Sequence, residues 1–410
     1  MTRLLHMKGD CATRLYLDTV HTVLEHGDEY APRGRRIREM RPAVIEFTDP
    51  SDCLVQVEGR KLNPFFHASE ILWVLLGRSD TAWLDLFNTN MKTFSDDGAH
   101  FNAPYGERMR TWGKHDLTGE IHTPRDQLYS VWRLLSADAD TRQATLSILD
   151  PRYDHADYID GGGKDYPCNT ALYFKIRQGA LDLTVTNRSN DVHWGLFGAN
   201  LPVFSTVQAL MASWLGVPVG TYTQFSDSMH TYLDDYGAHL NTIALDARDG
   251  PVEKRTFDEA VPILPRTPED SNAMLFGAEA LAEKVILDDG AVQTFIEHPA
   301  KLTRFSADIS KVLDDPYFEM LIRLMLAYRI HMQDAGEAPG LTAEQSRVDA
   351  LLTILGDIPA GNWKRSALVF LASSTRYTHQ AEGNIFKNLL DELDAVAKTT
   401  TRDIIREGTQ

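Results

Sequence analysis

The stretch DYPCNTALYFKIRQGALDLTVTNRSNDVHWGLFGANLPVFS, residues 165–205, decides the fold. Apolar and polar residues alternate along 172–176 and again along 181–185, which is the period of a half-buried strand. Gly179 stands between the two runs, where a tight turn would need it. The sequence therefore predicts two antiparallel strands joined by a short turn.

Five polar groups flank this predicted hairpin: Cys168 before its first strand, Arg188 and Ser189 at the end of its second, and then Asp191 and Asn200. A thiolate is a strong nucleophile, and a neighbouring cation lowers the pKa of a thiol. A guanidinium group beside a hydroxyl group suits a phosphate. A carboxamide donates and accepts side by side, which is enough to recognise the edge of a pyrimidine. Together these groups indicate covalent catalysis on a nucleotide.

The order C-x19-R-S-x-D, followed by Gly195, Asn200 and the H-x-Y pair His230 and Tyr232, resembles the thymidylate synthase and pyrimidine nucleotide hydroxymethylase superfamily. Three further blocks are similar to that family in the same order: SEILWVLLG at 69–77, APYGERMR at 103–110 and TRQATLSI at 141–148. The resemblance covers about residues 30–235. It implies an α+β fold in which helices pack on a mixed sheet.

The resemblance assigns catalytic positions to Cys168, Glu70, Tyr105 and Asn169, the last of which stands where synthases usually have a histidine. Glu70 lies within an apolar run expected to be a helix over 64–77, where an unpaired carboxylate would be costly. A buried carboxyl group there can hold or relay a proton. The alternative interpretation is a surface glutamate on an amphipathic helix.

The resemblance assigns phosphate binding to Arg188, Ser189, Arg33 and Arg142. In the family the strand that carries Arg142 serves the partner subunit, so we expect a homodimer. Gln143 stands where synthases have a second arginine, and it adds no charge. For the basic stretch around Arg33, a solvated charged turn is the alternative interpretation.

Base and sugar recognition fall to Asn200, His230 and Tyr232 in the family. An asparagine can match the N3–H and O4 of uracil, whereas relatives that act on cytosine tend to carry an aspartate. The segment before Asn200 is one residue longer than the family's, which leaves cytosine open. We therefore expect a pyrimidine nucleoside monophosphate as substrate, with dUMP favoured and dCMP or CMP possible.

The chain departs from the synthase pattern where the family shields its reaction centre. Phe94 and Asp97 stand in place of a tryptophan pair, and Asn169 replaces histidine. The resemblance implies that 5,10-methylenetetrahydrofolate is the cofactor and that Asp191 and Phe94 face it. A looser shield favours water over hydride at the last step, which predicts a 5-hydroxymethyltransferase. The alternatives are a thymidylate synthase that methylates dUMP, and a non-catalytic nucleotide- or folate-binding regulator.

Composition limits what else the chain does. It has 410 residues, 43% of them hydrophobic, and a formal net charge of -17, which argues against a nucleic-acid partner. Its three cysteines show no metal-site spacing, and we find no signal peptide or membrane span, so the expected location is the cytoplasm. We expect a catalytic domain over 1–240, a linker or lid over 241–270 and a helical C-terminal extension over 271–410. Helical patterns in that extension lie near 272–287, 316–333, 342–355, 364–374 and 383–398.

Overall fold

The computed structural model describes residues 4–113, 123–160, 163–250, 252–256, 261–334, 342–377 and 384–401. Its first part contains the helices α1 (Ala12–His26), α2 (Pro64–Leu75), α3 (Thr81–Asp85), α4 (Tyr105–Arg110), α5 (Gln127–Ala137), α6 (Pro151–Asp160), α7 (Leu201–Leu215) and α8 (Asp235–Arg248). The strands there are β1 (Leu5–Gly9), β2 (Asp28–Tyr30), β3 (Ile37–Met40), β4 (Ala43–Phe47), β5 (Thr145–Ser147), β6 (Asn169–Arg177), β7 (Ala180–Asn187), β8 (Asn190–Asp191), β9 (Val219–Ser226) and β10 (Met229–Tyr232).

The predicted hairpin is confirmed as β6 and β7. The two strands pair antiparallel, with Leu172 opposite Val185 and Phe174 opposite Leu183. The connecting residues Gln178 and Gly179 both have positive φ, 52° and 78°. Two successive positive φ values match the right-handed twist of a hairpin, and glycine adopts this conformation without strain.

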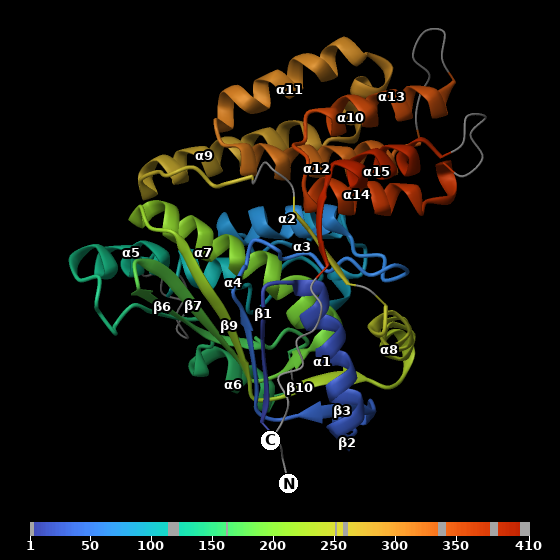
Figure 1. The fold of residues 1–410 in the computed structure, drawn as a ribbon. Coiled ribbons are helices and arrows are strands. Elements are labelled where there is room, and N and C mark those ends of the chain that lie inside the picture. The colour runs from blue at the N-terminus through green and yellow to red at the C-terminus, as the bar shows by residue number, and fades with distance from the viewer. Residues whose placement is uncertain are drawn as a thin grey trace.

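The hairpin lies inside a six-stranded sheet with the order β1-β4-β9-β7-β6-β5. The sheet is mixed, because β1–β4 and β7–β9 pair parallel and the other pairs are antiparallel. On one face α7 packs on β7 and β9 and covers side chains such as Leu183, which is fully buried, and α2 packs on α7 (Figure 1). On the other face Tyr173 and Phe225 are more than a third exposed. A second sheet, β2-β3-β10-β8, brings the ends of β8 and β10 together. The expected α+β class with a mixed sheet is confirmed.

The segment before Asn200, expected as a loop, is instead a π-helix, Val192–Asn200, that runs directly into α7. Its wide turns accommodate an extra residue, and such turns frequently occur at functional sites. The buried guanidinium of Arg60 donates to the carbonyl oxygens of His193 and Phe197, both at 2.8 Å. The combined stretch Val192–Leu215 is long and apolar enough to cross a membrane, but 83% of its most apolar window is buried within the protein.

The C-terminal part is a helical layer that packs on α2 (Figure 1). Its elements are α9 (Pro268–Leu281), α10 (Asp289–Glu297), α11 (Pro299–Leu313), α12 (Pro316–Met332), α13 (Ala343–Gly356), α14 (Asn362–Ala372) and α15 (Ile385–Val396), with β11 (Glu253–Thr256) paired to β12 (Lys398–Thr401). The helices expected near 316–333, 342–355, 364–374 and 383–398 are confirmed within a few residues. The helices α8, α10 and α11 were not predicted from the sequence. The stretch 241–270, expected as a linker or lid, begins within α8 and contains β11. The division into domains stays a prediction.

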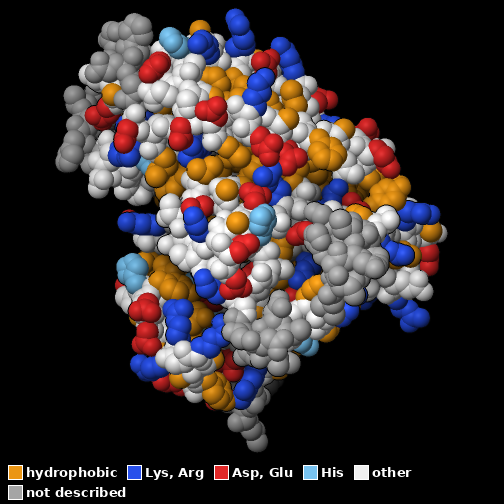
Figure 2. All heavy atoms as spheres, turned by 180° about the vertical axis from the view of Figure 1, so that it is seen from behind, with side chains coloured by type: hydrophobic (Ala, Val, Ile, Leu, Met, Phe, Trp, Pro, Cys, Tyr) orange, Lys and Arg blue, Asp and Glu red, His pale blue; other side chains and the backbone are white. Residues whose placement is uncertain are grey.

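Figure 2 shows the face opposite to that of Figure 1, on which basic and acidic side chains are interspersed. Because an extended basic surface would group Lys and Arg, a phosphate on this face would need a local cluster of arginines. Within the described residues, no group of three or more His, Cys, Asp or Glu side chains could hold a metal ion.

Candidate active site

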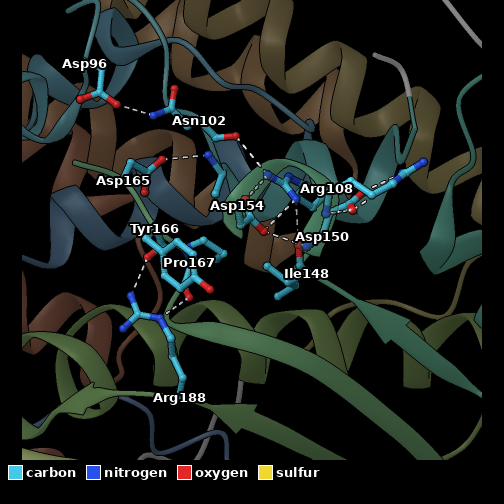
Figure 3. A network of polar contacts seen from close by, with 12 residues as sticks. Asp96, Asn102, Arg108, Ile148, Asp150, Asp154, Asp165, Tyr166, Pro167 and Arg188 are labelled. Carbon is cyan, nitrogen blue, oxygen red and sulfur yellow. Dashed lines mark hydrogen bonds and ion pairs between the residues drawn. The ribbon is translucent and has the colours of Figure 1, made fainter. Parts of the chain in front are cut away.

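Cys168 ends a segment that is fastened on both sides, immediately before β6 begins. Asp165 Oδ2 accepts from the backbone N–H of Ala103 at 2.9 Å. Arg188, at the end of β7, donates from Nε to Pro167 O at 2.9 Å and from Nη2 to Tyr166 O at 3.0 Å (Figure 3). The Arg188 guanidinium also lies 4.4 Å from the centre of the Tyr166 ring. These contacts hold the backbone before Cys168 in place, and none of them involves the Cys168 sulfur.

The thiol of Cys168 is placed beside a cation. Arg188 Nη2 lies 3.7 Å from Sγ. Burial raises the pKa of the Cys168 thiol above its ordinary value, and the positive charges of Arg188 and Arg33 oppose that shift, whereas Asp165 and Asp191 add to it. Because the guanidinium is hydrogen-bonded to the carbonyl oxygens of Tyr166 and Pro167, the two residues before Cys168, it stays where it stabilises a thiolate.

Asn200 and Tyr105 both contact Asn169, the residue that follows Cys168. Asn169 Nδ2 donates to Asn200 Oδ1 at 3.0 Å, and both side chains are buried. The ring of Tyr105 stacks on Phe204 of α7, 6.2 Å between centres. Burial raises the pKa of Tyr105, although hydrogen bonds from Asn169 act in the opposite direction. The phenol therefore stays protonated at neutral pH and can donate a hydrogen bond.

Glu70 lies on the side of α2 that faces the protein, with only 15% of its side chain exposed. Its Oε2 and the Nδ1 of His67, one turn earlier, are buried and have no hydrogen-bond partner within the described parts of the chain. The two atoms are 3.9 Å apart, too far for a direct hydrogen bond and close enough to share one water molecule. Phe66 of the same turn contacts Trp194 of the π-helix, 5.7 Å between ring centres.

The residues expected at the sugar and the folate meet where β8 and β10 pair, with His230 opposite Asp191. His230 is buried, and desolvation lowers its pKa. Its ring meets that of Tyr232 edge to face at 5.3 Å. Asp191 caps the π-helix by accepting from the N–H groups of His193 and Trp194, and it also accepts from the hydroxyl of Tyr236.

Four of the predicted site residues take no part in the hydrogen bonds and ring contacts described above. Arg33 is exposed but lies near enough to act electrostatically on Cys168, and Ser189 is half-buried at the end of β7. Arg142 is exposed just before β5. Phe94, half exposed, ends a short 3-10 helix. Among the described residues, Arg188 and Arg33 are the arginines whose charges act most on the pKa of the Cys168 thiol, and Arg142 is not one of them.

Several residues that the fold brings to this region were not predicted as site residues from the sequence. Asp165 precedes Cys168 by three residues, and His67 precedes Glu70 by one helical turn, so both spacings were visible. Arg35, whose guanidinium lies 4.2 Å from the centre of the Tyr232 ring, was visible only as part of a basic stretch. Two asparagines, Asn187 and Asn190, flank the Arg188-Ser189 pair. Only the folded structure shows that Asn187 contacts Asn169 and that Asn190 contacts Asn200.

A cavity of about 700 Å³ lies elsewhere and contains none of the predicted site residues. It is bounded by the loop before Cys53, the C-terminal half of α7 and the first residues of α12 and α14. Cys53 faces it, but burial raises the pKa of that thiol to about 12. This cysteine therefore stays protonated near neutral pH, whereas Cys168 has a cation beside its thiol.

Comparison with known proteins gives the same assignment of family. A family model described as thymidylate synthase matches residues 14–289. A deoxyuridylate hydroxymethyltransferase of Bacillus phage SP01 is 41% identical over 376 residues, which is 89% of this chain and 93% of the relative. A deoxyuridylate hydroxymethyltransferase of Pseudomonas phage M6 is 30% identical, over 80% of this chain and 83% of the relative. A putative thymidylate synthase of Methanococcoides burtonii is 28% identical over 50% of this chain and 78% of the relative. This protein is a member of the thymidylate synthase family.

Proposed function

We propose that the protein is a folate-dependent 5-hydroxymethyltransferase that acts on dUMP. The observation that carries the proposal is the placement of the Cys168 sulfur 3.7 Å from Arg188 Nη2 within a thymidylate synthase fold. Two relatives that align with most of the chain are named deoxyuridylate hydroxymethyltransferase, which supports the substrate and the product. Both are at least 30% identical to this chain.

In the proposed reaction the Cys168 sulfur bonds to carbon 6 of the pyrimidine, and the electron pair of the 5,6 double bond moves toward carbon 5 and O4. Arg188 stabilises the thiolate before the attack. Asn200 holds the base edge through its carboxamide. The Tyr105 phenol, kept protonated by burial, donates a hydrogen bond close to the reacting atoms. Arg188, Ser189 and Arg33 hold the 5′-phosphate.

Methylenetetrahydrofolate, when bound, supplies the one-carbon unit that carbon 5 takes up. The surface around Asp191 suits such a ligand. Trp194, three residues after Asp191, is 42% exposed, and its ring packs against that of Phe66. An exposed indole offers a flat face to an aromatic ring system. We propose that Trp194 and Asp191 contact the folate. Phe94, half exposed on its short helix, would join them only in the bound complex.

Loss of the carbon 5 proton and departure of tetrahydrofolate would leave an exocyclic methylene group on the nucleotide. In the final step of this proposal water adds to that methylene carbon, and the 5,6 double bond re-forms as the Cys168 sulfur leaves carbon 6. Glu70 Oε2 and His67 Nδ1, both buried without a partner within the described residues, can hold one water molecule between them. A carboxylate in contact with that water can accept its proton. The oxygen then ends in the hydroxymethyl group, and the proton is carried by Glu70.

The test is incubation of the protein and methylenetetrahydrofolate with each of dUMP, dCMP, UMP and CMP, read by product mass. We expect dUMP to gain one CH2O unit and tetrahydrofolate to be released. A gain of one CH2 unit with formation of dihydrofolate would instead make the protein a thymidylate synthase. No product from any nucleotide would favour a non-catalytic binding protein.

We also propose that the active enzyme is a homodimer in which Arg142 serves the partner's phosphate. Arg142 is exposed at the edge of the main sheet, and the uncovered face of that sheet presents Tyr173 and Phe225. Cys168→Ala and Arg142→Ala proteins, each inactive alone, should regain activity when their subunits exchange. A mixture that stays inactive after mass spectrometry has shown heterodimers would contradict this arrangement.

A further inference from the structure

Four buried asparagine side chains form a closed ring of hydrogen bonds behind Cys168. Asn169 donates to Asn200 at 3.0 Å, Asn200 donates to Asn190 at 3.3 Å, and Asn190 donates to Asn187 at 3.3 Å. Asn187 then donates back to Asn169. In each contact Nδ2 is the donor and Oδ1 the acceptor, so the ring runs in one direction. Each of the four residues is at most 6% exposed.

The surrounding backbone is shaped to hold this asparagine ring. A Cβ atom at Gly195 would lie 2.4 Å from Asn190 Oδ1, so only glycine leaves room for the ring there. Asn190 Nδ2 also donates to Ser226 Oγ at 3.1 Å. Asn200 is the residue before α7, yet its side chain makes no capping hydrogen bond to that helix. Its carboxamide is committed to the asparagine ring instead.

We propose that the asparagine ring fixes which way Asn200 presents its carboxamide, and that this orientation makes uracil the preferred base. The inference rests on the proposed function, in which Asn200 contacts the pyrimidine. Asn169, Asn187 and Asn190 are then positioning residues that set base preference through Asn200. They need not touch the base.

The hydrogen-bond capacity of a carboxamide supports this step. A carboxamide has two N–H donors and two acceptor lone pairs. The asparagine ring uses one of each on Asn200, and within the described residues no other protein group pairs with the second N–H or the second lone pair. One remaining donor and one remaining acceptor match O4 and N3–H of uracil. Cytosine presents the opposite pattern, an amino donor and an unprotonated N3, and would need the carboxamide turned over.

Turning Asn200 alone is costly. Its nitrogen would then face the nitrogen of Asn169, and its oxygen would face the oxygen of Asn190. A buried polar group that loses its partner is strongly destabilising. Binding cytosine in the same way therefore requires that all four side chains turn together, and the ring opposes the change as a unit.

The experiment compares two isosteric variants that place one carboxylate at different positions of the same ring. In Asn169→Asp the carboxylate can only accept, so one contact of the ring must bring two oxygens together. That contact costs least between two neutral carboxamides, so the carboxylate attracts the Nδ2 of Asn200 and turns that carboxamide over. In Asn190→Asp the carboxylate replaces a group that already accepts from Asn200, so the orientation is kept. Binding of dUMP and of dCMP is measured by calorimetry without folate, at about pH 8, well above the ordinary pKa of an aspartate but low enough for uracil to keep its N3 proton.

We expect the wild-type protein and Asn190→Asp to bind dUMP more tightly than dCMP. In Asn169→Asp the ratio of the two affinities should move toward dCMP by at least about tenfold. Asn200→Asp, which changes the base-contacting group itself, serves as the positive control. Circular dichroism and thermal unfolding confirm that each variant is folded.

Two outcomes would overturn the inference. If Asn169→Asp and Asn190→Asp shift the ratio equally, the carboxylate acts through its charge and not through the direction of the ring. If neither shifts it while Asn200→Asp does, the ring is structural only. Wild-type protein that binds neither nucleotide would overturn the proposed function itself, which is a different result from either of these.

Discussion

Cys53 and Cys168 belong to the same folded body, and burial raises the pKa of both thiols, yet their surroundings differ in charge. The nearest charges that act on Cys53 are the carboxylates of Asp52 and Asp49, which raise its pKa further, to about 12. Cys168 instead has Arg188 and Arg33 acting on it. Burial alone therefore makes a cysteine inert, and the arginines distinguish a candidate nucleophile from a core residue.

The carboxylates near the two cysteines differ in the same way. Asp52 accepts from the backbone N–H of Ala12 at 3.0 Å and from Asn362 Nδ2 at 3.2 Å, so it joins the first part of the chain to α14. Glu70 keeps one buried oxygen without a partner in the described regions. Saturated hydrogen bonding indicates a structural carboxylate, whereas an unpaired buried oxygen indicates one that awaits a ligand or water.

The largest expected effect separates the two cysteines directly. Cys168→Ala should abolish release of tritium from carbon 5 of labelled dUMP, a loss of about 10⁴-fold or more, because the variant lacks the thiol that lies beside Arg188. Cys53→Ala should keep that activity within about twofold and lower the free energy of unfolding by about 1 kcal/mol. Equal losses of activity in both variants would contradict the assignment of Cys168 as the nucleophile and Cys53 as a core residue.

The two carboxylates give the next effect. Glu70→Gln should lower kcat for product formation by about 10²- to 10³-fold, because an amide cannot accept the proton. Asp52→Asn should leave kcat unchanged and lower the unfolding midpoint in urea, because its hydrogen bonds weaken. His67→Phe, which removes the polar atom but keeps the ring, should reduce kcat less than Glu70→Gln does. A normal kcat in Glu70→Gln would remove this carboxylate from the mechanism.

A smaller effect concerns the arginine beside the thiol. Arg188→Ala should raise the pKa of Cys168 and slow its alkylation by iodoacetamide near neutral pH by about tenfold, because the stabilising charge is lost. Arg188→Lys keeps the charge but not the fork of donors, so its rate should be intermediate. Mass spectrometry of the labelled peptide reads each cysteine separately, and Cys53 should stay unlabelled until the protein is unfolded. Alkylation at an unchanged rate in Arg188→Ala would show that the guanidinium does not stabilise the thiolate.

The smallest effect is the dependence of stability on pH at Cys53. The folded-state pKa of about 12 exceeds the ordinary value of 9.0, so between these values the folded protein retains a proton that the unfolded chain has released. The contribution is therefore present below about pH 9 and falls by about 1.4 kcal/mol for each pH unit above it. Urea unfolding at pH 7 and 10 measures this loss. The Cys53→Ala protein should show a shallower loss, and an identical slope would contradict the assignment.

The sequence predicted the hairpin because the alternation in 172–176 and 181–185 is local and regular. It predicted the family because Cys168 and Arg188 keep a fixed spacing. It missed α11, although apolar residues at Leu302, Phe305 and Ile309 carry the helical period. The asparagine ring and the π-helix were not predicted, because both depend on contacts between residues far apart in the sequence.

The asparagine ring could not be read from the sequence, because its four members come from four elements. They meet only when β6 pairs with β7, which places Asn169 opposite Asn187, and when the π-helix brings Asn200 to Asn190. The segment 192–200 looked like a loop because it contains Gly195 and Gly198 and does not have the period of an α-helix. Its π-helical turns depend on Arg60, which is more than 130 residues away and donates to two of its carbonyl groups. Contacts of this range leave no local pattern.

The central claim is that water, and not hydride, completes the reaction at the Cys168 site. Its most direct test is a single-turnover reaction of the enzyme with dUMP and methylenetetrahydrofolate that carries deuterium at its hydride-donating carbon, run in ¹⁸O-labelled water. The account predicts a 5-hydroxymethyl product that contains ¹⁸O and no deuterium, together with tetrahydrofolate that retains its deuterium. A 5-methyl product that contains deuterium, with dihydrofolate released, would contradict it.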